Sequence, residues 1–378
     1  MNTASSISGE WHNAQRAWLR ISRRLVHWLE QPLVSAMMRR SAVDDVLSAL
    51  HPLLSLSEVR ARVVSVKVET FDTKTLMLQP NSHWQGARSG QFVRVQVEIQ
   101  GKRHERAYSL SSAEGTGTLA ITVKRQGLVS QYLHDNVKPG AVLTISQASG
   151  TFTLPNEDQQ PLPERILLLS AGSGITPVMA ILRSLHAQHY MGDVVFVHMC
   201  SNESDLIFSA ELKRLQGQMP RLTLATHFSQ IHGRLEPSRL RAIVPDLEHR
   251  STWMCGPGAW MDRMHDYWQT ELPAAALHSE RFGSPPRMMV AVGDPAEISC
   301  TTSGRTFTAA GGDTLLVQAE RAGLAPKHGC RMGICASCQC VKASGSVQNL
   351  VTGEVSSAAN ETIRLCISAA RSDVTLAL

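Results

Sequence analysis

The chain has 378 residues, enough for about two to four domains, and its apolar share of 43% is typical of a globular rather than a disordered protein. The net charge of +5 is modest and there is no long basic run, so nucleic-acid binding is not expected. No apolar run approaches the ~18 residues of a membrane-spanning helix, and arginines interrupt the start of the chain, so neither a membrane span nor a signal peptide is expected.

Residues 1–57 are expected to form a helical extension. Apolar residues recur there at spacings of three and four, namely Trp11, Ala14, Trp18, Ile21, Leu25 and Trp28. This pattern predicts a helix that ends near Pro32, and a second helical stretch runs from Val34 to about Leu50. The tryptophan stripe either packs on the body of the chain or docks on a membrane surface or a membrane-bound partner, because a basic face opposite tryptophans suits an interface.

Residues 58–157 change to a strand-like period. Short β-rich runs separated by glycine turns predict an antiparallel barrel. Arg106, Tyr108 and Ser109 fall on one strand, where they could pair with a phosphate, lie against a flavin ring and hydrogen-bond near its reactive nitrogen. Gly127 and Ser130 open a short helix whose N–H groups suit a second phosphate contact.

Residues 158–284 contain buried apolar runs at 166–169 and 194–197, which predict strands covered on both faces. The first run leads into the turn Gly172-Ser-Gly174-Ile-Thr176-Pro177 and then a helical stretch to about His186. A strand, a glycine turn and a helix together cradle a pyrophosphate at the helix N-terminus. The third glycine of the common dinucleotide fingerprint is missing.

Cysteines dominate the last segment, residues 285–378. Cys330, Cys335 and Cys338 have the spacing C-x4-C-x2-C, and Cys366 follows. Four thiolates at this spacing hold a plant-type [2Fe–2S] cluster. Zinc or a disulfide framework is the alternative, although zinc sites usually pair two such knuckles and only one is present. Thiolate clusters and free thiols persist best in a reducing compartment, so we expect the protein in the cytoplasm or at the inner face of the membrane.

Regular elements are expected around the cysteine loop. Alternating runs predict strands at 296–300, 305–308 and 374–378, and the apolar pattern of 314–322 predicts a helix. Cys340 would share a strand face with Cys338 and is interpreted as a buried thiol rather than a fifth ligand.

In this order the motifs resemble the ferredoxin–NADP reductase superfamily, joined to a ferredoxin of the β-grasp type. The resemblance implies a multidomain α/β and β fold: an antiparallel flavin-binding β-barrel, an α/β nicotinamide-binding domain and a C-terminal β-grasp [2Fe–2S] domain. It implies that Arg106, Tyr108, Ser109, Gly127 and Ser130 bind the flavin.

The resemblance also assigns residues near the hydride path. Its cofactor-binding turns correspond to Gly172, Gly174, Thr176, Pro177, Gly256 and Pro257. Ser109, Cys255 and Glu280 would form the catalytic group, and Lys124 would touch the flavin through its backbone. The alternatives are a buried filler thiol for Cys255, a surface carboxylate for Glu280 and a solvated strand-end lysine for Lys124.

The choice of cofactors stays partly open. FAD is favoured over FMN, although both flavins occur with an Arg-x-Tyr-Ser strand. A 2′-phosphate requires a basic residue just after the second strand, but residues 201–205 are acidic there, and Lys213 and Arg214 lie further along the chain. This arrangement favours NADH slightly over NADPH.

Electron counting gives the expected activity. NAD(P)H donates two electrons at once and a [2Fe–2S] cluster accepts one, whereas a flavin between them accepts two and releases them singly. Electrons would pass from nicotinamide to flavin, cluster and an external acceptor. A non-catalytic redox sensor would keep the cysteines but needs no hydride site, so it is disfavoured.

Pro52, Arg60 and the turn Gln79-Pro-Asn-x-x-Trp84 suggest an acceptor. They resemble electron-transfer partners of membrane-bound acyl-CoA desaturases of the stearoyl-CoA type, with the N-terminal helix as a peripheral membrane contact. The alternative is the reductase component of an oxygenase that hydroxylates rings or oxidises CoA thioesters.

Overall fold

The computed structural model describes Leu47 and Gly333 and residues 51–156, 160–282, 295–309, 313–328 and 338–378. The two helices expected in residues 1–50 therefore lie outside the described residues, except for Leu47. One compact unit comprises the described parts of 1–164, 175–194 and 200–224, and the other those of 165–174, 195–199 and 225–378. Within the described ranges, no helix is both long enough and apolar enough to cross a membrane.

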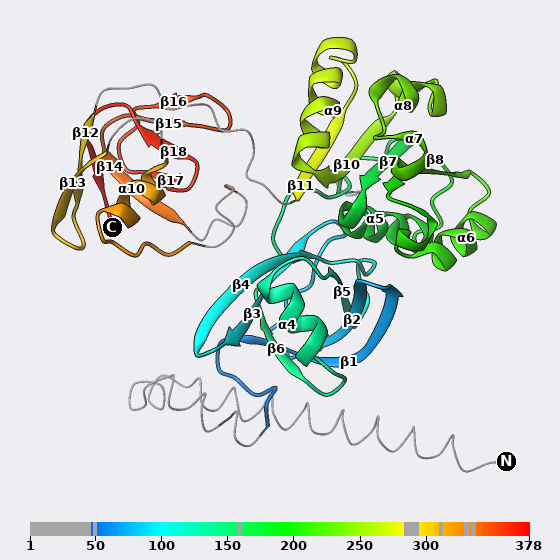
Figure 1. Ribbon diagram of the computed structural model, residues 1–378, viewed down its shortest axis with the longest axis horizontal. Coiled ribbons are helices and arrows are strands. Elements are labelled where there is room, and N and C mark those ends of the chain that lie inside the picture. The colour runs from blue at the N-terminus through cyan, green and yellow to red at the C-terminus, as the bar shows by residue number, and fades with distance from the viewer. Residues whose placement is uncertain are drawn as a thin grey trace. The chain divides into compact units, whose positions relative to one another are not determined.

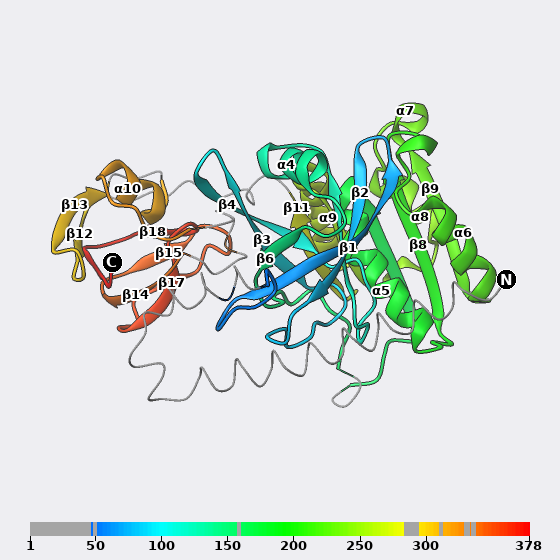
Figure 2. The ribbon, with the colours of Figure 1, turned by 90° about the horizontal axis from the view of Figure 1, so that it is seen from below.

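Six antiparallel strands form the barrel of the first unit (Figures 1 and 2). The strands are β1 (Val59–Thr70), β2 (Thr73–Pro80), β3 (Phe92–Ile99), β4 (Lys102–Ser109), β5 (Leu119–Lys124) and β6 (Val142–Ile145). Their spatial order is β4-β3-β6-β1-β2-β5, and a bridge between Leu110 and Ile121 joins the two ends of that order. This confirms the expected antiparallel barrel.

Alternation of side chains explains why these segments form a barrel. Val59, Ala61 and Val63 of β1 are at most 5% exposed, whereas the residues between them are partly exposed. Helix α4 (Leu128–Asn136) follows β5 and buries Val129 and Leu133 in the same core. The barrel interior is therefore filled by side chains, and a cofactor must bind on its outside.

The segment before β1 is fastened to the barrel by three side chains. Arg60 Nη1 donates to the carbonyl of Leu54 at 3.0 Å, and Asn81 Nδ2 donates to the carbonyls of Leu53 and Glu58 at 3.1 and 3.0 Å. His83 Nε2 lies 2.8 Å from the carbonyl oxygen of Ser55. The chain thus enters the barrel along a fixed path.

The nicotinamide-binding part has a five-stranded sheet of order β11-β10-β7-β8-β9. Its strands are β7 (Arg165–Ala171), β8 (Asp193–Cys200), β9 (Leu222–Phe228), β10 (Ser251–Pro257) and β11 (Leu277–Phe282). The helices are α5 (Ile175–Ala187), α6 (Ser209–Gln218), α7 (Ser229–His232), α8 (Pro237–Ile243) and α9 (Gly258–Glu271), and the 3-10 turns are η1 (Gly172–Gly174), η2 (Glu203–Asp205) and η3 (Leu247–His249). The apolar runs predicted as strands are the cores of β7 and β8.

The strand order creates a switch point at the end of β7. The chain goes from β7 to β8 on one side, and later returns to place β10 on the other side, parallel to β7 and β11. Ligands of open α/β sheets bind where the strand order reverses, at the carboxyl ends of the strands. The glycine turn η1 begins at this point.

The last segment folds on strands of its own. They are β12 (Ala296–Cys300), β13 (Arg305–Ala309), β14 (Gln339–Ser344), β15 (Val347–Asn349), β16 (Val355–Ser356), β17 (Glu361–Arg364), β18 (Ser368–Ala370) and β19 (Val374–Leu376). They form a five-stranded sheet of order β13-β12-β19-β14-β17 and a small sheet of order β16-β15-β18. Helix α10 (Leu315–Arg321) begins after Thr314, whose hydroxyl accepts from the Val317 N–H, and this confirms the helix expected at 314–322.

Candidate active site

The flavin strand is β4. Arg106 and Tyr108 are two residues apart and so share one face of the strand, whereas Ser109 is buried on the other. Arg106 is exposed, and Nη1 donates to the carbonyl of Glu105 at 2.8 Å. An exposed guanidinium beside a half-buried phenol fits a ligand with a phosphate and a flat ring. Arg106 and Tyr108 therefore share one face of β4 and Ser109 lies on the other, and the flavin roles of all three stay predictions.

With the flavin removed, we expect Tyr108 to ionise later than an exposed tyrosine. Burial raises its pKa from 10.0 to about 12, although the charge of Arg106 acts in the opposite direction. Because the folded pKa is raised, this tyrosine contributes stability that is complete below pH 10 and is lost as the pH rises through 12. Ultraviolet titration of the apoprotein and of Tyr108→Phe measures this, and a difference curve centred near the ordinary tyrosine pKa would contradict it.

The turn before α4 is held by Ser130. Its hydroxyl accepts from the N–H groups of Gln126 and Gly127 at 2.9 and 2.8 Å and lies 2.9 Å from the Gly127 carbonyl. Ser130 therefore shapes the turn rather than pointing its hydroxyl outward. The N–H groups in the first turn of a helix have no intrahelical partner, so this end of α4 suits a phosphate.

Lys124 ends β5 and forms an ion pair with Asp72, with Nζ 3.1 Å from Oδ2. Asp72 also accepts from the hydroxyls of Thr70 and Thr73 at 2.9 Å. Burial acts to raise the pKa of Asp72, but the hydrogen bonds from Thr73 and Lys124 lower it below its usual value. The lysine is thus not merely a solvated strand end, and its backbone contact to a flavin stays a prediction.

The glycine turn after β7 lies against β10. Gly172 has a positive φ of 55°, a conformation that favours glycine. A Cβ atom on Gly174 would overlap the carbonyl oxygen of Cys255 and would lie 2.8 Å from the Gly256 Cα. Thr176 and Pro177 follow, buried, in the first turn of α5. The turn therefore approaches the Cys255-Gly256 backbone as closely as a residue without a side chain permits.

Cys255 and Glu280 lie side by side at the ends of β10 and β11. They are paired in the parallel register, as are Cys255 and Ser170 of β7. Cys255 is fully buried; burial raises the pKa of its thiol, and the nearby charge of Glu280 raises it further. The thiol is therefore protonated at neutral pH, which suits a group that packs against a ring rather than a nucleophile.

Ser170, the register partner of Cys255, belongs to a buried polar pair. The Ser170 hydroxyl lies 2.9 Å from Nδ1 of His198 on β8, and His198 Nε2 has no hydrogen-bond partner among the described residues. Burial lowers the pKa of His198 to about 3, so its ring is neutral. The sequence analysis missed this pair, although one polar residue in each of two apolar strands, at Ser170 and His198, was a visible signal.

Two of the four predicted cluster ligands are described. Cys338 precedes β14 and Cys366 follows β17, both buried, and the Leu365 N–H donates to the Cys338 carbonyl at 3.1 Å. The Gly333 N–H points at the Sγ of Cys366 at 3.2 Å. An N–H aimed at sulfur stabilises a thiolate, as the ligands of an iron–sulfur cluster require. Cys330 and Cys335 lie outside the described residues.

Barrel, nucleotide cradle and iron–sulfur segment define a class of protein: a modular, nucleotide-dependent flavoprotein reductase. The sequence matches three families, described as oxidoreductase FAD-binding domain (residues 60–154), oxidoreductase NAD-binding domain (168–266) and 2Fe-2S iron-sulfur cluster binding domain (298–371).

Known proteins resemble the chain over most of its length. The chain is 34% identical to an NADPH oxidoreductase of Mycobacterium tuberculosis, over 88% of each chain. It is 30% identical to a glycine betaine monooxygenase reductase subunit of Pseudomonas aeruginosa, over 83% of this chain and 94% of that one. The solved structure of phthalate dioxygenase reductase shares its fold, with a TM-score of 0.56 and 20% identity over 85% of this chain and 98% of that one.

The chain belongs to the ferredoxin–NADP reductase type of oxidoreductases, with FAD-binding, NAD-binding and [2Fe–2S] domains. It is an NAD(P)H-dependent reductase with a flavin and an iron–sulfur cluster. Bound flavin supplies the means of accepting an electron pair and releasing it one electron at a time. The roles of single site residues and the preference for NADH stay predictions.

Proposed function

We propose that this reductase supplies single electrons from NAD(P)H to the iron centre of an oxygenase. The observation that carries the proposal is the 30% identity to a monooxygenase reductase subunit, which extends over 83% of this chain and 94% of that one. An oxygenase that activates O2 needs two electrons delivered in separate steps, and a [2Fe–2S] cluster carries one at a time. This makes the alternative acceptor of the sequence analysis the preferred one.

The composition of the iron–sulfur segment fits delivery by a tethered domain. Residues 287–378 contain eight Lys or Arg and seven Asp or Glu residues, so the segment is close to neutral. A free ferredoxin often relies on charge to find its reductase, whereas a linker supplies a high effective concentration without it. The segment's surface can then serve recognition of the acceptor.

A membrane-bound acyl-CoA desaturase is the second candidate. It rests on the segment before the barrel, which Arg60, Asn81 and His83 hold in a fixed path by contacts with residues 53–58. These side chains belong to the stretch that resembles desaturase partners. A fixed exit path would give an N-terminal docking element a defined position on the reductase.

Reoxidation by cell fractions separates the two acceptors. We expect the NADH-reduced protein to be reoxidised, in the presence of O2 and substrate extracts, by the soluble fraction of its own cells and not by washed membranes. The rate is followed by the return of the cluster's visible absorbance. Reoxidation by membranes alone, lost when residues 1–50 are deleted while cytochrome c reduction persists, would favour the desaturase and contradict the oxygenase proposal.

A further inference from the structure

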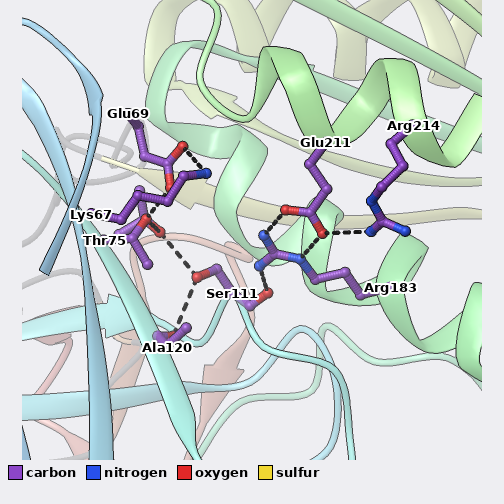
Figure 3. A network of polar contacts seen from close by, with 9 residues as sticks. Lys67, Glu69, Thr75, Ser111, Ala120, Arg183, Glu211 and Arg214 are labelled. Atoms are coloured by element: carbon purple, nitrogen blue, oxygen red, sulfur yellow. Dashed lines mark hydrogen bonds and ion pairs between the residues drawn. The ribbon is translucent and has the colours of Figure 1, made fainter. Parts of the chain in front are cut away.

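Helix α5 is attached to the barrel by an arginine with three partners (Figure 3). The Nη1 atom of Arg183 donates to the carbonyl oxygen of Ser111. Its Nε and Nη2 atoms donate to the two carboxylate oxygens of Glu211 on α6, at 3.0 and 2.6 Å. The guanidinium carbon also lies 4.7 Å from the centre of the Phe208 ring. Each of the three guanidinium nitrogens therefore has a protein acceptor.

The barrel end of this contact is rigid. The Ser111 N–H donates to the Ala120 carbonyl at 2.8 Å, and its hydroxyl lies 3.0 Å from that of Thr122. Thr122 in turn contacts the Thr75 hydroxyl at 2.8 Å, and Thr75 donates to Glu69 at 2.9 Å. Figure 3 shows this chain of polar groups running from Lys67 and Glu69 to Ser111. A shift of the Ser111 carbonyl would therefore disturb several strands.

A second attachment lies next to the first. The Ser184 hydroxyl contacts the hydroxyl of Ser89 and accepts from the Glu114 N–H at 3.0 Å. Ser89 and Ser184 are 4% and 3% exposed. Two consecutive residues of α5 thus bond to two barrel segments, one at residue 89 and one at residues 111–114. This arrangement fixes both the position and the rotation of the helix.

The attached elements carry the two halves of the reaction. Ser111 follows Ser109 of the flavin strand by two residues, and α5 begins with Ile175, Thr176 and Pro177 of the nucleotide cradle. Thr176 and Arg183 lie on one continuous helix, about 10 Å apart along its axis at 1.5 Å per residue. Because a helix is stiff over that length, a displacement at Arg183 moves the cradle.

The ion pair between Arg183 and Glu211 is buried, and breaking it is costly. Both side chains are largely buried, with 17% and 22% exposure. Burial acts to raise the pKa of Glu211, but the hydrogen bond and charge of Arg183 hold it below its usual value. Removing Arg183 would leave the buried Glu211 carboxylate and the Ser111 carbonyl without this donor. The resulting loss of stability exceeds the net stabilisation that the ion pair provides.

We propose that Arg183 is a positioning residue for hydride transfer, which locks the nucleotide-cradle helix to the flavin strand. Each of its three guanidinium nitrogens donates to Ser111 or Glu211, so it acts through these two residues rather than on a reacting atom. Displacements of about 1 Å can slow a reaction about a hundredfold, so this lock controls the rate more than the affinity for the nucleotide.

Three holoprotein variants test the lock: Arg183→Leu, Glu211→Gln and, for the second attachment, Ser184→Ala. The control is Arg241→Leu. This exposed arginine lies on α8, and its Nη1 atom is 2.9 Å from a carboxylate oxygen of Glu248. Flavin reduction by NADH is followed anaerobically by stopped flow. We expect Arg183→Leu to lower the limiting rate at least about tenfold with the NADH dissociation constant changed less than threefold, and Arg241→Leu to change neither.

Hydrogen exchange gives a readout independent of activity. In Arg183→Leu, peptides covering α5 and residues 109–122 should exchange faster than in the parent protein, with flavin and iron content unchanged. If the limiting rate of flavin reduction in Arg183→Leu lies within twofold of the parent rate, the proposal is overturned. If that variant does not fold, unchanged rates in Glu211→Gln and Ser184→Ala overturn it instead. The test needs no protein acceptor, so its outcome is independent of the proposed oxygenase.

Discussion

Replacing Cys366 with serine should abolish electron delivery to cytochrome c while leaving ferricyanide reduction by NADH intact. The Cys366 side chain is 2% exposed and accepts an N–H from Gly333, as a cluster-ligating thiolate would. Serine is a harder and far more basic ligand than a thiolate, so it holds iron–sulfur clusters poorly. We expect a loss of at least about a hundredfold in cytochrome c reduction, because one-electron transfer to it depends on the cluster.

Cys340 provides the matched control. It lies on β14, two residues beyond Cys338, and is 7% exposed, with Sγ 3.6 Å from the Val341 carbonyl oxygen. We expect Cys340→Ala to keep a full cluster, measured as iron, acid-labile sulfide and visible absorbance. A Cys366→Ser protein with a stoichiometric cluster, or a Cys340→Ala protein that folds without one, would refute the ligand assignment.

Substituting Gly174 with alanine should strongly lower the rate of flavin reduction by NAD(P)H. The added methyl would overlap the Cys255 carbonyl oxygen and lie 2.8 Å from the Gly256 Cα, and both contacts are with backbone. Strand β10 cannot retreat, because it is paired with β7 on one side and β11 on the other. We expect the limiting rate of flavin reduction to fall about a hundredfold, with up to about 3 kcal/mol lost from the free energy of unfolding.

Gly217 of α6 is the control for this substitution. A Cβ atom there meets nothing within 4 Å, and the residue lies in a helix. Gly217→Ala should leave flavin reduction unchanged and raise the free energy of unfolding by up to about 1 kcal/mol. Stopped-flow reduction and urea unfolding of both variants measure these effects. Equal behaviour of the two alanine variants would show that the close approach at Gly174 does not matter.

The spacing of apolar and capping residues predicted single strands and helices correctly. The apolar run of residues 166–169 became the buried centre of β7, and Thr314 began a helix because its hydroxyl caps the first turn. The three-domain fold followed from motif order and is confirmed by the family matches. Local patterns sufficed for these features because apolar periodicity and helix capping involve residues close together in the sequence.

Contacts between distant segments were not predictable in this way. Arg183 lies in a largely buried helix, and only the fold shows that its partners are Ser111 and Glu211. Gly127 and Ser130 were expected to open a helix whose N–H groups suit a phosphate, but only the fold shows that the Ser130 hydroxyl accepts from the Gln126 and Gly127 N–H groups. The pair of Ser170 and His198 requires β7 and β8 to lie side by side in register. Such features depend on three-dimensional neighbours that spacing does not encode.

The iron–sulfur segment forms its sheets from strands that all lie after residue 295, and among the described strands none is shared with the barrel or the nicotinamide-binding sheet. Its core likewise comprises residues of this segment alone. Gene rearrangement could therefore move it to the opposite end of a reductase, or exchange it for another electron carrier, without breaking a strand ladder. Exchange of this one domain during evolution can thus change the electron acceptor while the flavin and nicotinamide domains are inherited unchanged.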